Sequence, residues 1–97
     1  MEKNYGACMI SLADREKILE IAEMYNVKRI MLFGSSTAAD YEGRDIDLAV
    51  EGVRPEDFYS FYGDLMFSLS KPVDVVDLAG DSKFIRMINQ EGVPLYG

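Results

Sequence analysis

Residues 30–52, IMLFGSSTAADYEGRDIDLAVEG, decide the fold. The stretch opens with an apolar run that a Gly34-Ser35 pair closes, and it ends in alternating acidic and apolar residues. Alternation with period two predicts a strand from Ile46 to Val50 with one apolar face. Asp45 and Asp47 then share the opposite face, because successive side chains of a strand point to opposite sides.

Two neighbouring carboxylates on one strand face repel each other, and no lysine or arginine lies between Asp45 and Asp47. A divalent cation over the pair removes the repulsion. Magnesium and manganese suit such a place, since they take one or two carboxylates together with substrate phosphates and water. The pair alone is better explained as a solvated strand face, so the metal hypothesis depends on what accompanies it.

A third carboxylate accompanies it. Asp74 lies between Val73 and Val75, which are expected to face the core, so its side chain emerges on the other face. An aspartate among valines is unfavourable unless that face is open to solvent or metal. Together with Asp45 and Asp47 it predicts a two-metal site for displacement at phosphorus. The alternative for Asp74 is an ordinary surface position on a strand.

Gly34 and Ser35 fit the same chemistry. Glycine lets backbone amides approach a phosphate closely, Ser35 adds a hydroxyl donor, and a helical turn from Ser36 would direct its N-terminus at the anion. Without the aspartates, the pair is simply a turn that ends a strand. Asp77 has the opposite strand parity from Asp74 and is interpreted as a turn or cap residue.

The flanking patterns predict an α/β (α+β) domain with a small mixed sheet and helices mainly on one face. Ser11 and Asp14 resemble a capping box, and Asn26 is a left-handed helix terminator. Pro55 fits a first helical turn. The expected helices span residues 12–25, about 55–69 and a segment after Asp81 or Ser82 that buries Phe84, Ile85 and Ile88; the expected strands span residues 28–33, 46–50, 73–78 and 93–96.

Composition narrows the classes of function. A chain of 97 residues forms one domain, residues 1–97. The net charge of −7 argues against an extended nucleic-acid surface but permits a nucleotide bound through metal. The absence of histidine excludes histidine-based catalysis and metal ligation, and Cys8 has no disulfide partner. The N-terminus lacks a long apolar segment, so we expect a cytoplasmic protein without a membrane partner.

The runs FGSSTAADYEGRDIDLAV and VDVVDL, in this order, resemble the minimal nucleotidyltransferases of the DNA polymerase β superfamily. The resemblance implies that AMP is transferred from ATP to a hydroxyl, with release of pyrophosphate and dependence on two Mg²⁺ or Mn²⁺ ions. It assigns Asp45, Asp47 and Asp74 to the metals and to catalysis. It assigns Gly34 and Ser35 to the β- and γ-phosphates.

Members of this family are often antitoxins paired with a small helical HEPN toxin, and some adenylylate a tyrosine on it. The resemblance therefore implies a HEPN-type partner, or a homo-oligomer, since the chain has no room for a helical acceptor domain. Tyr59 and Phe67, which lie off the core side of their helix, are candidates for such an interface.

The sequence departs from the family's Gly-Ser-Arg-x-Arg-Gly pattern, because Ser36, Ala38 and Ala39 stand at its Arg, Arg and final Gly positions. Arg44 replaces the small residue that the family usually has before the first aspartate. We expect Ser36 to contact the nucleotide, and Arg44 either to contact a phosphate or to pair with Asp45. An alternative function is therefore an antitoxin-type module that neutralises its partner by contact alone. A phosphohydrolase or Toprim-like site ranks lower, since Toprim sites need a glutamate where Gly34-Ser35 stands. Lys28 and Arg29 are interpreted as solvated charges.

Overall fold

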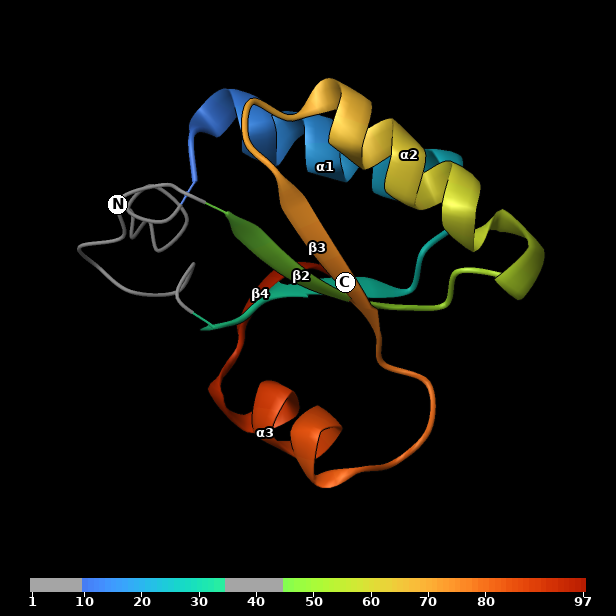
Figure 1. Cartoon of the computed structure of the whole chain (residues 1–97), viewed down its shortest axis with the longest axis vertical. Coiled ribbons are helices and arrows are strands. Elements are labelled where there is room, and N and C mark those ends of the chain that lie inside the picture. Colours follow the sequence, from blue (N-terminus) through green and yellow to red (C-terminus); the bar gives the residue numbers. More distant parts are fainter. Residues whose placement is uncertain (1–9, 35–44) are drawn as a thin grey trace.

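The computed structural model describes residues 10–34 and 45–97. Four strands form one sheet in the spatial order β3-β2-β1-β4, in which β1 is antiparallel to both neighbours and β2 is parallel to β3. The elements follow the chain in the order α1 Leu12–Met24, β1 Arg29–Leu32, β2 Ile46–Glu51, the 3₁₀ turn η3 Pro55–Asp57, α2 Phe58–Ser68, β3 Val73–Asp77, α3 Lys83–Glu91 and β4 Val93–Tyr96 (Figure 1).

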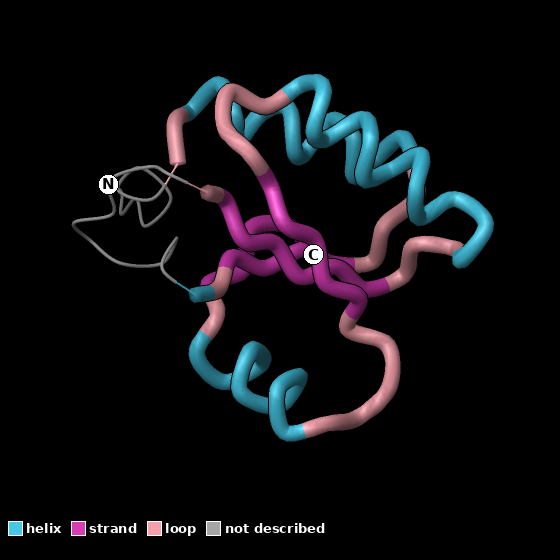
Figure 2. Tube along the Cα trace, viewed as in Figure 1, coloured by secondary structure: helices cyan, strands magenta, loops and turns pink. Residues whose placement is uncertain are grey.

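Two helices cover one face of the sheet and one helix covers the other. Helices α1 and α2 lie side by side above the strands in Figure 1, and α3 lies below them; Figure 2 shows the same three layers. The larger cluster of buried side chains lies between the sheet and the α1/α2 layer, and a smaller one, formed by Met31, Ala49, Leu78 and Ile88, lies on the α3 side. The predicted α+β fold with a mixed sheet is confirmed.

Helix α1 begins and ends where its sequence signals indicate. Ser11 caps it, since its Oγ accepts a hydrogen bond of 3.1 Å from the backbone N–H of Asp14. Ile18 and Ala22 are completely buried one turn apart, which gives the helix its core face. Asn26 adopts a left-handed conformation with φ of 55°, so the helix cannot continue past it.

Helix α2 packs against α1 through aromatic and polar contacts. Phe61 and Leu65 are completely buried beneath it. The rings of Tyr25 and Phe61 meet edge to face with centroids 5.5 Å apart, and the Tyr25 hydroxyl donates a 2.6 Å hydrogen bond to Asp64 Oδ2. No helix in the described residues is both long and apolar enough to span a bilayer.

Helix α3 has the predicted bounds, between Ser82 and Gly92, but it is less deeply packed than predicted. Ser82 caps it by accepting a 3.1 Å hydrogen bond from the Ile85 N–H, and Ile88 is completely buried. The prediction that Phe84 is buried is wrong, since this side chain is 47% exposed. Its ring meets the edge of Phe33 at a centroid distance of 5.8 Å. Among residues 10–34 and 45–97, α3 is the helix on this face of the sheet, and its nine residues do not bury the Phe84 ring.

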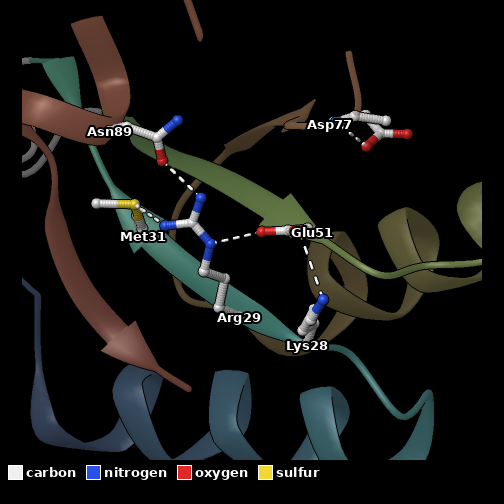
Figure 3. Close-up of polar contacts among 7 residues, drawn as sticks. Lys28, Arg29, Met31, Glu51, Asp77 and Asn89 are labelled. Atoms are coloured by element: carbon white, nitrogen blue, oxygen red, sulfur yellow. Dashed lines mark hydrogen bonds and ion pairs between the residues drawn. The ribbon is translucent and has the colours of Figure 1, made fainter. Parts of the chain in front are cut away.

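Arg29 is not a solvated charge as predicted, because three neighbours hold its guanidinium (Figure 3). Its Nε donates to Glu51 Oε1 at 2.6 Å, and its two terminal nitrogens donate to Asn89 Oδ1 at 2.6 Å and to the Met31 sulfur at 3.2 Å. Arg29 thus joins β1 to β2 and to α3. The prediction for Lys28 holds, since its exposed Nζ lies only at the limit of ion pairing, 4.0 Å from Glu51.

Candidate functional site

The two parallel strands bring two predicted site residues opposite each other. Asp47 on β2 is in register with Asp74 on β3. One step further along the same strand face, Ala49 is in register with Val76, and both pack in the cluster under α3. Since side chains two residues apart share a face, Asp47 and Asp74 lie on the α3 side of the sheet. The prediction that Asp47 and Asp74 point away from the larger core is confirmed.

The residues that flank Asp74 in the sequence point toward the core, as predicted. Val73 is buried in the larger cluster and Val75 packs against it, while Asp74 is exposed. Asp77 forms a turn at the end of β3, where its Oδ1 accepts a 2.9 Å hydrogen bond from the Ala79 N–H. Strand β3 therefore carries one carboxylate that closes a turn, Asp77, and one on the α3 face of the sheet, Asp74.

The carboxylate of Asp47 lies in an environment that disfavours its charge. Partial burial raises the pKa of Asp47, and the nearby carboxylates of Asp74 and Asp45 raise this pKa further. Asp45 itself is exposed and lies immediately before β2. The three predicted carboxylates are thus close enough to interact through space, although they come from segments separated by up to 29 residues (74 − 45).

Gly34 lies directly against Asp47. It follows β1 and has a φ of +67°, in the left-handed region that favours glycine. A Cβ at this position would come within 2.8 Å of Asp47 Oδ2. The preceding residue, Phe33, donates its backbone N–H to the carbonyl of Asp47 at 3.1 Å. Any side chain at position 34 would therefore displace the Asp47 carboxylate. This contact favours glycine here independently of any phosphate that approaches the backbone.

Three further predicted residues, Ser35, Ser36 and Arg44, lie outside the described residues, as does the predicted helical turn near residues 36–40. Their proposed phosphate contacts stay predictions.

The donor set is made only of oxygen, which suits a hard divalent cation. Across residues 10–34 and 45–97, no three side chains of His, Cys, Asp or Glu are grouped closely enough to hold one metal ion by themselves. Magnesium does not need such a group, because it commonly binds one or two carboxylates and completes its shell with phosphates and water. The arrangement of Asp47 between Asp45 and Asp74 fits ions that bind together with a phosphorylated ligand.

One buried carboxylate near the site was not predicted as part of it. Asp14 is 3% exposed, and its Oδ1 and Oδ2 accept hydrogen bonds from the N–H of Ser70 at 3.1 Å and from its hydroxyl at 2.5 Å. This contact fastens the start of α1 to the connection that leads into β3. The sequence signal at Asp14 was that of a helix cap, and the local pattern gives no indication of a partner 56 residues away.

The comparisons with known proteins agree with this geometry. A family model described as Polymerase beta, Nucleotidyltransferase matches residues 16–97. The chain belongs to the polymerase beta nucleotidyltransferase family. The matched range includes Gly34 and all three carboxylates, so the family assignment rests on the whole site and most of the fold.

Several solved structures are similar to this nucleotidyltransferase chain. A chain of a toxin–antitoxin crystal structure with AMP-PNP is 27% identical, with a TM-score of 0.68, 86% of this chain covered and 73% of that one. A rebuilt and re-refined structure of a tri-AMPylated Shewanella oneidensis HEPN toxin in complex with MNT antitoxin contains a 24% identical chain, with a TM-score of 0.65 and coverage of 87% and 70%. The latter likeness shows the fold alone. Among curated proteins, none matches.

Proposed function

We propose that this nucleotidyltransferase domain, residues 1–97, transfers AMP from ATP to a hydroxyl group in a reaction that depends on Mg²⁺ or Mn²⁺. The observation that carries the proposal is the register of Asp47 with Asp74 across parallel strands, with Asp45 close enough to raise the pKa of Asp47 further. Fixed carboxylates that repel one another weaken the fold locally, and positive charge brought by a metal–nucleotide complex relieves that repulsion.

In the proposed reaction, the acceptor oxygen forms a bond to the α-phosphorus of ATP while the bond from this phosphorus to the α,β-bridging oxygen breaks. Pyrophosphate leaves with the bonding electron pair. The hydroxyl proton passes to a carboxylate oxygen of Asp74 and then to solvent. Asp45, Asp47 and Asp74 are the residues that would hold the metal ions, and Asp74 would also orient the acceptor hydroxyl. When bound, the metals neutralise charge that develops on the phosphate oxygens.

The phosphates would be held at the turn after β1. We assign Gly34, Ser35 and Ser36 to backbone and hydroxyl contacts with the β- and γ-phosphates, and Arg44 to a charged contact. Support for Gly34 comes from its position against Asp47, where a turn without a side chain leaves the carboxylate accessible. A phosphate at this turn would therefore lie next to the metal-binding carboxylates.

The acceptor in this proposal is a tyrosine of a HEPN-type partner protein. Support comes from the solved structures of toxin–antitoxin complexes, one of them with a tri-AMPylated HEPN toxin. Helix α2 supports it independently, because Tyr59, Met66 and Phe67 are 84%, 61% and 93% exposed on its surface. Large exposed apolar side chains that gather on one helix are typical of a protein interface.

Calorimetry with ATP tests the proposal. We expect the wild type to bind ATP only when Mg²⁺ or Mn²⁺ is present, and Asp47→Asn to lose this metal-dependent part. Asp77→Asn serves as the matched control, since Asp77 is an exposed carboxylate on the same pair of strands that closes a turn. If ATP binding proved independent of metal, or equal in wild type and Asp47→Asn, the proposed site would be wrong.

A second candidate is a module that neutralises its partner by contact without catalysis. The exposed apolar surface of α2 favours it, since an interface there needs none of the carboxylates. A partner that stays inhibited by the Asp45→Asn, Asp47→Asn double variant, and is released by Phe67→Glu, would support this function. Met24→Glu is the control for the second change, because Met24 is a similarly exposed apolar residue on α1.

A further inference from the structure

A pocket opens beside the candidate site, at the outer edge of the sheet. It has a volume of about 500 Å³ and lies between the C-terminal end of α2 and the start of β3. Its lining comprises Tyr62, Met66, Leu69, Ser70, Lys71, Pro72, Val73 and Asp74. This volume is in the range of pockets that hold small ligands or single large side chains. Asp74 belongs both to this lining and to the carboxylate group of the site.

We propose that this pocket is the acceptor subsite of the nucleotidyltransferase and that Met66 and Lys71 determine which side chain it accepts. The inference rests on the proposed function and deepens it. Val73 and Asp74 on β3 lie opposite Ile46 and Asp47 on β2. The pocket and the proposed metal-binding carboxylates therefore lie at the same end of these two strands. A side chain that enters the pocket thereby comes close to Asp74.

The lining selects an aromatic side chain with a neutral hydroxyl. Tyr62, Met66 and Leu69 supply an apolar wall, and methionine sulfur and aromatic rings pack well against another ring. Lys71 and Asp74 supply one charge of each sign. A hydroxyl satisfies both, since it accepts from an ammonium group and donates to a carboxylate. A carboxylate side chain would be repelled by Asp74, and an ammonium side chain by Lys71.

The edge of β3 accommodates the backbone that carries this side chain. Pro72 O accepts from Ile46 N–H and Leu78 N–H donates to Val50 O, both at 2.8 Å. Since alternate residues of a parallel strand bond to the same neighbour, Val73 and Val75 direct their backbone groups away from β2. No strand in the described part of the chain pairs with that edge. An extended polypeptide can add there as a further strand.

The Asp14–Ser70 contact fixes one wall of the pocket. Ser70 lines it, and both its N–H and its hydroxyl are held by a carboxylate that is 3% exposed. The position of Lys71, the next residue, is therefore set by α1 as well as by β3. A preformed wall reduces the ordering that binding would otherwise require.

Amide chemical shifts of the full chain, titrated with three backbone-matched probes, test this inference. The probes are N-acetyl-L-tyrosinamide, N-acetyl-L-phenylalaninamide and N-acetyl-L-serinamide. We expect the tyrosine probe to shift the amides of residues 66–71, 73 and 74 saturably and to bind about tenfold more tightly than the serine probe, the equivalent of about 1.4 kcal/mol. Met66→Trp, which fills the pocket, should weaken the tyrosine probe by a similar factor. Met24→Trp should not, since Met24 is equally exposed but on α1.

Lys71→Gln gives a second, independent readout. It should remove most of the preference for the tyrosine probe over the phenylalanine probe and leave the phenylalanine probe unaffected. Equal binding of the tyrosine and serine probes, or unchanged tyrosine binding in Met66→Trp, would overturn the inference. Binding of AMP-PNP with Mg²⁺ is measured on the same samples. Absence of AMP-PNP binding would refute the proposed transfer reaction. Normal AMP-PNP binding without saturable binding of the tyrosine probe would refute the acceptor pocket alone.

Discussion

The two ends of strand β2 carry acidic side chains in opposite environments. At the C-terminal end, the hydrogen bond from Arg29 lowers the pKa of Glu51, and the charges of Arg29 and Lys28 lower this pKa further against the effect of burial. At the N-terminal end, burial raises the pKa of Asp47, and Asp74 and Asp45 raise it further. Asp47 and Glu51 are only four positions apart (51 − 47), yet the fold favours the charged form of Glu51 and disfavours that of Asp47.

The contrast indicates different roles for the two ends of β2. The Glu51 end joins β1, β2 and α3 through Arg29 and needs nothing beyond the chain itself. The Asp47 end gathers like charges and has a glycine packed against its central carboxylate. Carboxylates whose pKa values are perturbed in this way are candidates for function, and a metal–nucleotide complex would bring positive charge to them. Four sets of substitutions test this contrast.

The largest expected effect is on AMP transfer. Asp74→Asn should reduce the rate at least about a hundredfold, since removing one preformed charged group of a reaction site has effects of that order. Asp77→Asn, on the same strand, should leave the rate within about twofold of wild type, because asparagine keeps the oxygen that closes the turn. Transfer of labelled AMP from ATP to a HEPN-type protein gives both rates. Equal losses in the two variants would contradict a specific role for Asp74.

The next effect is on folding and concerns Asp14. Asp14→Ala should lower the free energy of unfolding by about 1–3 kcal/mol, because the Ser70 N–H and hydroxyl lose their acceptor. Urea unfolding measures it. Ser70→Ala removes only the hydroxyl, so it should lose less, and the double variant should lose little more than Asp14→Ala. Independent, additive losses would contradict a direct contact.

Substitutions at two glycines distinguish the effect of backbone strain from an effect on the nucleotide site. Gly34→Ala and Gly80→Ala both place a side chain at positive φ, +67° and +92°, which should reduce stability by roughly 1–2 kcal/mol in each case. Only Gly34→Ala also meets Asp47 Oδ2, whereas nothing lies within 4 Å of the added Cβ at Gly80. Calorimetry should therefore show weaker Mg²⁺–ATP binding for Gly34→Ala alone. Normal nucleotide affinity in this variant would remove Gly34 from the site.

The smallest effect is a crossed pH dependence. The folded pKa of Asp47 is raised above 3.8, so its ionisation destabilises the fold, and Asp47→Asn should be more stable than wild type at pH 7 and equal to it below pH 3.8. The folded pKa of Glu51 is lowered below 4.5, so Glu51→Gln should be less stable than wild type at pH 7 and approach it as the pH falls below that lowered value. Both differences should be at most about 1 kcal/mol, because the groups are partly exposed. Urea unfolding at pH 7 and pH 3 measures both, and the same sign for the two variants would contradict the contrast.

Much of the site could be predicted because strand parity is local. The alternation around Ile46, Asp47 and Leu48, and around Asp74, determines which side chains share a face once both segments are strands. The register that sets Asp47 against Asp74 is a property of the pairing of two strands, and no local pattern specifies it. The closeness of Gly34 to Asp47 likewise depends on how β1 lies beside β2.

The errors also concern contacts between distant segments. Arg29 looks like a surface charge in its own sequence, and only the pairing of β1 with β2 and the position of α3 bring Glu51 and Asn89 to it. Asp14 looks like half of a capping box, yet its carboxylate binds Ser70. Phe84 has the periodicity of a core residue, but α3 covers too little of the sheet to bury it.

We infer that Asp47 is held at the expense of stability because it binds a metal–nucleotide complex. The most direct test is thermal unfolding of wild type and Asp47→Asn at pH 7, in EDTA and with Mg²⁺ and AMP-PNP. If this inference holds, Asp47→Asn unfolds at a higher temperature than wild type in EDTA, and Mg²⁺ with AMP-PNP stabilises only the wild type. A variant that is less stable than wild type in EDTA and is stabilised equally by the nucleotide would contradict it.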